Sequence, residues 1–339
     1  EWALNEKGYT YARSPQSSYC SGIGGYLAGR SAGMLSTKYG KIEDMLLGME
    51  VVLASGKVIR TRAVPRSAAG PNINSLFIGS EGTLGVITEA TLAIHPMPEE
   101  RRFRSFQFST LHSGFEASRK ILRRGLHPAS MRISDEAESQ AYYKQDGSFM
   151  TLSFDGFKSL VDLEESEAAA IALAEGGIDL GSEPGKRWWT RKYHSAYPSD
   201  DGRLLEMGPN TLTVGNVIDT AGSFEYLEAV HEEMKNAVMR LNGTTFMAHF
   251  SHWYKTGGMM YPYIVNNGVK SEEEMVDRYF RLHKLAVDAI LKLGGTVNHH
   301  HGVGLALRGF MKDEFGEGFE TLQDIKRVLD PNNIMNPGK

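Results

Sequence analysis

The sequence contains one cysteine, Cys20, among 339 residues, so it cannot form an internal disulfide. It also lacks any apolar run of membrane-spanning length and any signal-peptide pattern. Its formal net charge of -4 is too small to indicate nucleic acid as a partner. With 41% hydrophobic and 23% charged residues, the chain has the composition of a globular protein with room for two domains. Because a lone cysteine fits a reducing compartment, we expect a cytoplasmic protein.

The segment 80–89 is the first to indicate a binding site. It follows the apolar run 76–78 and leads into an alternating strand at 91–94. Its glycines, Gly82 and Gly85, let backbone N–H groups approach a ligand that a Cβ atom would hold away. A tight turn between two strands, without a ligand, is the alternative interpretation.

A second glycine-rich segment, 21–33, lies upstream. Each glycine inside a helix costs about 1 kcal/mol relative to alanine, so we do not expect an ordinary helix here. We interpret the segment as backbone pressed against a polyanion, to which Arg30 offers charge and Ser21 and Ser31 offer hydroxyl donors. The glycine spacing fits neither the dinucleotide fingerprint nor the Gly-Lys-Ser/Thr phosphate loop.

Hydrophobic periodicity predicts an α+β protein with a linker at 95–98. A hairpin is predicted over 49–61, and a long helix begins at a capping box, 271–274, and ends at 294–295. The other elements predicted after the linker are strands at 131–133, 149–154, 211–218, 245–250 and 259–265, and helices at 115–122, 159–174 and 224–241. These repeats suggest a ferredoxin-like antiparallel sheet that covers a cofactor.

Several motifs occur in a fixed order along essentially the whole chain. They are Pro15-Gln16-Ser17, Ser21-Gly22-Ile23-Gly24-Gly25, Gly29-Arg30-Ser31-Ala32-Gly33, Tyr39-Gly40-x-Ile42-Glu43-Asp44, residues 79–88, Pro128-Ala129-Ser130-x-Arg132, His299-His300-His301-Gly302-Val303-Gly304 and Asp330-Pro331-Asn332-Asn333-Ile334. Together they resemble the PCMH-type FAD-binding domain of the vanillyl-alcohol-oxidase superfamily. Within it, the chain is most similar to the branch of alkylglycerone-phosphate synthase (alkyldihydroxyacetonephosphate synthase) and its prokaryotic FAD-linked oxidase relatives.

The resemblance implies the fold and the cofactor. We expect an α+β protein with a PCMH-type FAD-binding domain, whose N-terminal part is missing, and a ferredoxin-like antiparallel-sheet cap. The expected domains are 1–98 for the FAD-binding part, 99–298 for the cap, and 299–339 for a C-terminal segment that carries the His motif and packs back on the FAD-binding part. FAD is the expected cofactor. A covalent link from Cys20 to the flavin is a further, less favoured idea, because a lone cysteine is usually a small buried residue.

The residues that the resemblance assigns to FAD fall in the two glycine-rich segments and just before them. They are Gln16, Ser17, Ser21, Gly22, Gly24, Gly25, Gly29, Arg30, Ser31, Ala32, Gly33, Glu81, Gly82, Thr83, Leu84, Gly85, Val86 and Ile87.

The histidines His299, His300 and His301 are the sharpest catalytic signal. They follow a predicted strand end at 296–297, and consecutive strand residues alternate sides, so at most two of the three rings can share a target. A metal is one alternative, with His249 and His252 as further candidate ligands. However, metal-using 2-hydroxy-acid dehydrogenases of the superfamily carry Glu-His-Gly at the place of 300–302, and a histidine where Tyr261 falls. We therefore expect no metal, and histidines that bind substrate or move protons.

Tyr261 matches the acid/base tyrosine of alkylglycerone-phosphate synthase by resemblance. A phenol with pKa near 10 needs a cationic neighbour to lose its proton at neutral pH, and a protonated histidine of the triplet is the candidate. Tyr263, two residues on along the same predicted strand, competes for the role. Arg132 and Arg203 are the candidate substrate-binding residues, and for both an ordinary surface ion pair is the alternative.

Three functions follow. The first is a flavoenzyme that exchanges the acyl group of acyl-dihydroxyacetone phosphate for a fatty alcohol, as in ether-lipid synthesis. The second is an FAD-linked oxidoreductase of a 2-hydroxy acid or another alcohol, and the third is a truncated, non-catalytic fragment. The expected partner is a small or lipid-like substrate, with no nucleic acid; peripheral membrane contact and a homodimer are left open.

Overall fold

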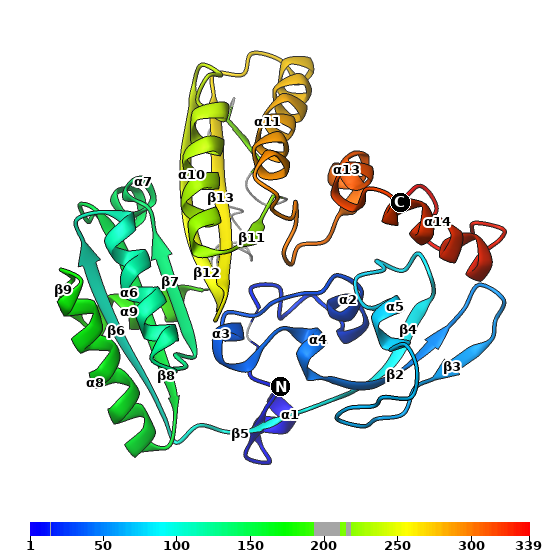
Figure 1. Cartoon of the computed structure of the whole chain (residues 1–339), viewed down its shortest axis with the longest axis horizontal. Helices are drawn as coiled ribbons and strands as arrows, with labels where there is room; N and C mark the ends of the chain where they lie inside the picture. Colours follow the sequence, from blue (N-terminus) through cyan, green and yellow to red (C-terminus); the bar gives the residue numbers. More distant parts are fainter. Residues whose placement is uncertain (14, 193–210, 215–217) are drawn as a thin grey trace, which may run out of the picture. The chain divides into compact units, whose positions relative to one another are not determined.

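The structure, a computed structural model, describes residues 1–13, 15–192, 211–214 and 218–339. The chain divides into two compact units. Unit 1 contains residues 1–33, 40–97 and 298–339, and unit 2 contains residues 34–39 and 98–297. Figure 1 shows the elements of both units coloured along the sequence.

Unit 1 is built around a three-stranded antiparallel sheet in the order β3-β2-β4. The hairpin predicted over 49–61 is confirmed as β2 and β3, because Gly56, with φ +79°, allows the tight turn between them. The elements of unit 1 are α1 (Trp2–Asn5), β1 (Tyr9–Thr10), α2 (Ile23–Ala28), α4 (Ile42–Met45), β2 (Leu46–Val52), β3 (Val58–Arg60), α5 (Asn74–Phe77), β4 (Val86–Leu92), β5 (His95–Pro96), α12 (Gly304–Leu307), the 3-10 turn η2 (Arg308–Phe310), α13 (Met311–Phe315) and α14 (Gly318–Leu329).

The core of unit 1 joins segments that are far apart in the sequence. Its buried members are Tyr26, Leu27, Ile42, Met49, Val51, Leu53, Phe77, Ile78 and Leu84. Ile325 and Leu329 of α14 pack against this cluster, so the C-terminal helix is part of the same hydrophobic core as the first glycine-rich segment.

Unit 2 is built on an eight-stranded antiparallel sheet in the order β10-β13-β12-β7-β8-β6-β9, with β11 also paired to β13. Its elements are α3 (Ser36–Tyr39), β6 (Glu100–Phe108), α6 (Leu111–Arg123), β7 (Ser130–Ser134), α7 (Glu136–Glu138), the π-turn η1 (Ser139–Tyr143), β8 (Ser148–Gly156), α8 (Lys158–Ala174), β9 (Ile178–Gly181), α9 (Glu183–Arg191), β10 (Thr211–Thr213), β11 (Thr220–Gly222), α10 (Phe224–Val238), β12 (Thr244–Tyr254), β13 (Gly257–Asn267) and α11 (Glu272–Lys292).

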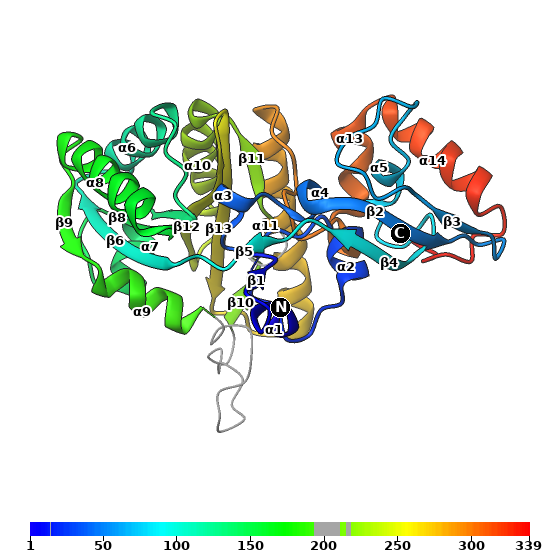
Figure 2. The same cartoon turned by 90° about the horizontal axis from the view of Figure 1, so that it is seen from below.

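Side-chain alternation along β6 places helices on both faces of this sheet. Phe108 lies beside Gly114 of α6, whereas Phe103 and Ser105 lie beside Gly185 of α9. Figure 2 shows α6 and α9 on opposite sides of the strands. The prediction of an α+β protein with antiparallel sheets is therefore confirmed. Of the strand predicted at 211–218, the structure confirms 211–213, while 215–217 lie outside the described residues.

None of the helices in the described part of the chain is both long and apolar enough to cross a membrane.

The N-cap of α11 can be tested by substitution of Ser271. The side chain of Ser271 accepts a hydrogen bond from the N–H of Glu274 at 3.1 Å, which confirms the N-cap half of the predicted capping box, whereas the carboxylate of Glu274 accepts from the N–H of Lys270. Ser271→Ala removes this acceptor, so we expect the free energy of unfolding to fall by about 1 kcal/mol in chemical denaturation. Ser159→Ala, at an exposed position in the first turn of α8, should change it by less than about 0.5 kcal/mol. Equal effects of the two substitutions would contradict the capping role.

Candidate functional site

The glycine-rich segment 21–33 contains a helix, α2, which begins after Gly22. The prediction that its glycines exclude a helix is wrong. The buried side chains of Tyr26 and Leu27 anchor α2, and their packing outweighs the low helix propensity of glycine. A Cβ atom on Gly24 would lie 2.7 Å from the carbonyl oxygen of Ile87 in β4, so Gly24 is what allows helix and strand to approach.

Gly33 differs from Gly22 and Gly25 in whether packing within the protein explains the glycine. A Cβ atom on Gly33 would lie 1.9 Å from the carbonyl oxygen of Arg13, so packing within the protein requires this glycine. At Gly22 and Gly25 a Cβ atom would meet nothing within 4 Å among the described residues. Packing therefore does not explain Gly22 and Gly25, whereas a cofactor lying against bare backbone would. On this observation the segment fits FAD.

The second glycine-rich segment forms a tight turn between α5 and β4. Its backbone is left-handed at Gly79, Glu81 and Gly82, with φ of +77°, +49° and +75°. A Cβ atom on Gly82 would again meet nothing within 4 Å among the described residues. The hydroxyl of Thr83 donates to the carbonyl oxygen of Ser80 at 2.7 Å, which holds the turn closed. The turn thus presents Gly82 as a second stretch of bare backbone.

Two residues assigned to the cofactor here, Leu84 and Gly85, also serve the core of unit 1. The side chain of Leu84 belongs to the hydrophobic cluster. A Cβ atom on Gly85 would lie 2.7 Å from a methyl group of Val51 in β2. Leu84 can therefore offer a ligand only its backbone, and Gly85 serves the packing of β4 on β2.

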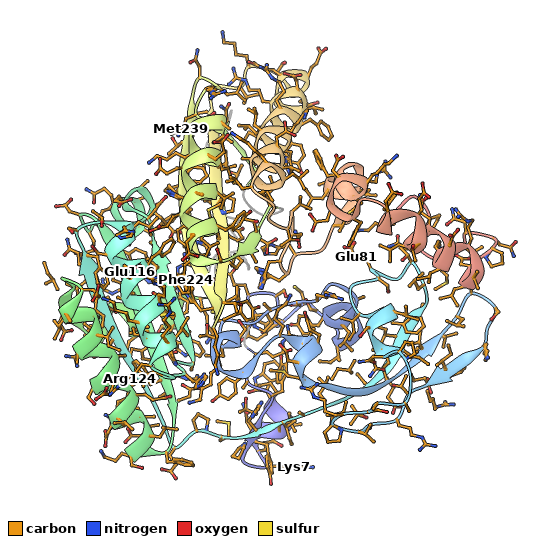
Figure 3. All side chains as sticks on the ribbon, viewed as in Figure 1. Lys7, Glu81, Glu116, Arg124, Phe224 and Met239 are labelled. Carbon is orange, nitrogen blue, oxygen red and sulfur yellow. The ribbon has the colours of Figure 1, made fainter. Side chains whose placement is uncertain are left out.

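Glu81 was assigned to the cofactor as well, but its carboxylate is engaged within unit 1. It accepts hydrogen bonds from the N–H groups of Val303 and Gly304, the latter at 3.1 Å, and forms an ion pair with Lys339. Its carbonyl oxygen accepts from Asn336 at 2.6 Å. Glu81, labelled in Figure 3, therefore connects the glycine turn to the C-terminal segment.

The remaining assigned residues surround these segments. Gln16, Ser21 and Arg30 are exposed, Ser17, Gly29 and Ser31 are half-buried, and Ala32 is buried. Val86 is exposed and Ile87 half-buried at the start of β4. These residues thus lie in the segment before α2, in the turn that follows α2, and at the start of β4.

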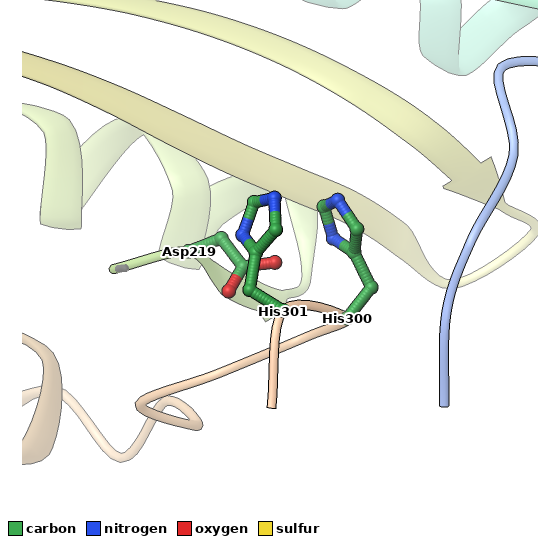
Figure 4. Close-up of side chains that lie close together, drawn as sticks. All are labelled: Asp219, His300 and His301. Atoms are coloured by element: carbon green, nitrogen blue, oxygen red, sulfur yellow. The ribbon is translucent and has the colours of Figure 1, made fainter. Parts of the chain in front are cut away.

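The histidine triplet lies in a turn, not after a strand as predicted. The side chain of Asn298 accepts hydrogen bonds from the N–H groups of His301 and Gly302, at 2.9 and 2.8 Å, and this curls the chain. The backbone at the triplet is therefore not extended as the prediction assumed, and the expectation that at most two rings share a target stays a prediction. The ring centroids of His299 and His300 are 5.2 Å apart, and those of His300 and His301 are 4.0 Å apart. Figure 4 shows the rings of His300 and His301 side by side.

Two contacts within unit 1 hold the histidine turn in place. The ammonium of Lys41 donates to the carbonyl oxygen of His299 at 2.6 Å. Gly302 has φ +83°, and a Cβ atom there would lie 2.8 Å from Oε1 of Glu81. The left-handed backbone favours glycine at this position, and the approach to Glu81 places the turn against the 79–85 loop.

A separate polar cluster lies on the sheet of unit 2. Arg132 in β7 donates to Oε1 of Glu138 at 2.9 Å, and Nδ1 of His249 in β12 lies 3.0 Å from the same oxygen. The ring of His249 stacks on that of Tyr261 in β13, with centroids 4.8 Å apart and planes inclined by 15°. His249 and Tyr261 are directly paired across the two strands, which explains the stack.

The cluster sets the protonation of its members. Burial alone would raise the pKa of Glu138, but Arg132 and His249 lower it to about 2, so Glu138 is ionised at neutral pH. Burial and Arg132 lower the pKa of His249, which is therefore neutral. Because the carboxylate only accepts, Nδ1 of His249 carries the hydrogen and Nε2 is the acceptor.

The pKa of Tyr261 is shifted in the direction opposite to the expected one. Burial is the main cause that raises the pKa of Tyr261, and the nearby Asp219 and Tyr263 raise it further. A cationic neighbour was expected to lower it; Arg132 does act in that direction, but it is outweighed. Tyr261 is therefore a neutral phenol at neutral pH.

Arg132, one of the two candidate substrate-binding residues, is committed to Glu138, so its positive charge is largely compensated. Arg203, the other candidate, lies outside the described residues. His249 and His252, weighed as a metal pair, have different partners, because Nδ1 of His252 lies 2.5 Å from the hydroxyl of Ser36.

Sequence reasoning missed Glu138 and the role of His249 beside it. The two residues are 111 positions apart, and no local pattern joins them. One available signal was the acidic Glu138 six positions after Arg132, at the end of the short helix α7.

Comparison with known proteins gives two family matches, which leave residues 63–96 outside both. Residues 97–339 match the FAD linked oxidases, C-terminal domain, and residues 1–62 match an FAD binding domain. The chain is 33% identical over its whole length to a relative in Escherichia coli (strain K12) described as the uncharacterized FAD-linked oxidoreductase YgcU, of which it covers 72%. It is 30% identical to the alkyldihydroxyacetonephosphate synthase of Trypanosoma brucei brucei over 99% of this chain and 59% of that protein.

Solved structures agree with these matches. An alkyldihydroxyacetonephosphate synthase structure superimposes with a TM-score of 0.77 at 27% identity, over 100% of this chain and 62% of that one. p-Cresol methylhydroxylase has the same fold, with a TM-score of 0.76 at 18% identity, over 98% of this chain and 72% of that one. The chain thus spans less than two thirds of the synthases that it matches. It belongs to the FAD-linked oxidases, a family of flavoenzymes whose cofactor is FAD.

Proposed function

We propose that the chain carries out the reaction of the alkylglycerone-phosphate synthases, in which the acyl group of acyl-dihydroxyacetone phosphate is exchanged for a fatty alcohol. The synthases of Trypanosoma brucei brucei and of the solved structure support this substrate class. The observation that carries it is the neutral pair of Tyr261 and His249 on unit 2, because the exchange needs a hydrogen-bond donor for the leaving carboxylate beside an acceptor for a substrate proton.

FAD, when bound, supplies an electron-accepting ring, and the residues of the chain handle protons and position. The phenol of Tyr261 donates a hydrogen bond to the departing carboxylate oxygen of the substrate and keeps its proton, because the fatty acid leaves as its anion. Nε2 of His249 is the acceptor for a substrate proton, since its Nδ1–H is held by ionised Glu138. Arg132 keeps Glu138 ionised and so acts through it. The histidine turn at 299–301 offers further imidazoles, fixed by Asn298 and Glu81.

The alternative is an FAD-linked oxidoreductase of a 2-hydroxy acid or another alcohol. The E. coli relative, and glycolate oxidase subunit GlcD of Bacillus subtilis (strain 168) at 26% identity over 99% of this chain, favour it. Against it stands the absence from the sequence of the Glu-His-Gly motif, since His300 occupies the position of the carboxylate ligand. An imidazole there lacks the negative charge that a carboxylate brings to a divalent ion.

Tyr261→Phe tests the proposed hydrogen-bond donor. The substitution removes only the hydroxyl and keeps the ring stack, so we expect kcat for fatty-acid release from acyl-dihydroxyacetone phosphate to fall by about 100-fold or more. Tyr263→Phe, two residues further along the same face of β13, is the matched control and should keep kcat within about threefold. A variant Tyr261→Phe with full activity would refute the assignment, and equal loss in both variants would make the role of Tyr261 a general one of packing.

Gly25→Ala tests the contact between bare backbone and cofactor. The added methyl meets no atom within 4 Å among the described residues, and alanine favours helix, so we expect the apoprotein to keep or raise its melting temperature. Affinity for FAD, measured by quenching of flavin fluorescence, should fall by about tenfold or more, because the methyl occupies the space of the cofactor. Gly318→Ala in α14, also open at its Cβ position, should leave affinity unchanged. Unchanged FAD binding in Gly25→Ala would show that the cofactor does not lie there.

A further inference from the structure

Arg13 is a buried cation in unit 1 that its neighbours do not satisfy. Its side chain is nearly inaccessible, with 1% of the residue exposed. Nη2 donates to the carbonyl oxygen of Ser31 at 2.6 Å, but Nε and Nη1 have no hydrogen-bond partner in the part of the chain that the structure describes. Buried guanidinium N–H groups are normally paired, so two unused donors indicate a missing acceptor.

Tyr26 adds a third unused polar atom at the same place. Its ring lies over the guanidinium of Arg13, with 4.4 Å between Cζ and the ring centroid. Its hydroxyl is buried and likewise has no partner among the described residues. The three atoms thus belong to one cation–π pair. Hydrogen bonds to one oxygen-bearing ligand would give all three a partner.

The charge of Arg13 is not compensated by a contact ion pair in the described residues. Burial is the main cause that lowers its pKa, and Tyr11, Tyr26 and Glu43 offset this only in part. Glu43, the one carboxylate among these neighbours, is itself paired with Lys41 at 3.3 Å. An anion or a carbonyl dipole is therefore electrostatically favoured beside Arg13.

Arg13 is also held rigidly against the first glycine-rich segment. Gly33 packs so closely that a Cβ atom there would lie 1.9 Å from the carbonyl oxygen of Arg13. Tyr26 directly follows Gly25, whose Cα faces open space. The backbone of Arg13 is therefore packed against the segment whose open glycines fit the cofactor.

We propose that Arg13 and the hydroxyl of Tyr26 bind an acceptor oxygen of FAD, either of its phosphates or of its flavin ring. Neither residue belongs to the set that sequence motifs assign to the cofactor. The assignment depends on FAD binding, which the family supplies, and not on the choice between transferase and oxidoreductase.

Arg13→Met is the direct test, because methionine fills much of the same volume without charge or donors. FAD affinity of the whole chain, measured by fluorescence quenching, should fall at least tenfold. The melting temperature of the apoprotein should not fall, since an uncompensated buried cation is removed. Arg66→Met, at an exposed position of unit 1, is the matched control and should bind FAD within twofold of the original protein.

Titration with riboflavin separates the two sources of the acceptor oxygen. If riboflavin loses affinity by the same factor as FAD, Arg13 binds the flavin ring; if only FAD loses affinity, it binds phosphate. Tyr26→Phe removes only the hydroxyl oxygen of Tyr26 and should weaken FAD binding several-fold. This variant tests the proposal even if Arg13→Met does not fold.

The proposal is overturned if Tyr26→Phe and any folded Arg13→Met bind FAD as the original protein does. It is also overturned if the original chain takes up no FAD, or if the donors are found on a buried water in a complex with FAD. In the Tyr261→Phe variant FAD binding should be unaffected, so failure of the proposed reaction and failure of this cofactor contact are distinguishable.

Discussion

The carboxylate of Glu81 is the interaction on which the arrangement of unit 1 depends. It joins a turn of the glycine-rich segment to backbone N–H groups 222 and 223 positions further along the chain. Lys326 strengthens the same junction by donating to the carbonyl oxygen of Thr83 at 2.9 Å. Because charge-assisted bonds to backbone N–H groups are strong, one side chain fixes the histidine turn relative to the bare backbone of Gly82. The left-handed backbone at Glu81, with φ +49°, is a modest strain that these bonds offset.

Unit 2 holds titratable side chains in defined protonation states. Ionised Glu138 accepts hydrogen bonds from both Arg132 and His249, and it carries the compensating charge that a buried guanidinium requires. The pairing of β12 with β13 then places the His249 ring against Tyr261. A neutral donor and a neutral acceptor thus share one sheet face without competing for a proton. This arrangement suits proton transfer within a cycle that has no net oxidation.

Sequence reasoning predicted the elements whose signals are local. The capping serine at 271 and the turn glycine at 56 marked the long helix and the hairpin, because cap and turn chemistry act within a few residues. It failed where distant packing overrides local preference. Buried Tyr26 and Leu27 make a helix of the glycine-rich segment, and one side chain, Asn298, turns the histidine triplet out of extended backbone. It also missed the partners of Tyr261 and the unpaired donors of Arg13, since these arise only when remote strands and segments meet.

The visible spectrum of the purified chain, loaded with FAD and kept without oxygen, tests the account most directly. The account predicts that FAD stays bound after desalting, that acyl-dihydroxyacetone phosphate with a fatty alcohol releases fatty acid with no net loss of flavin absorbance, and that lactate and glycolate do not bleach the flavin. Bleaching by either 2-hydroxy acid, without acyl exchange, would contradict the proposed reaction and leave an oxidoreductase in its place. Loss of all FAD on desalting would contradict the cofactor site itself.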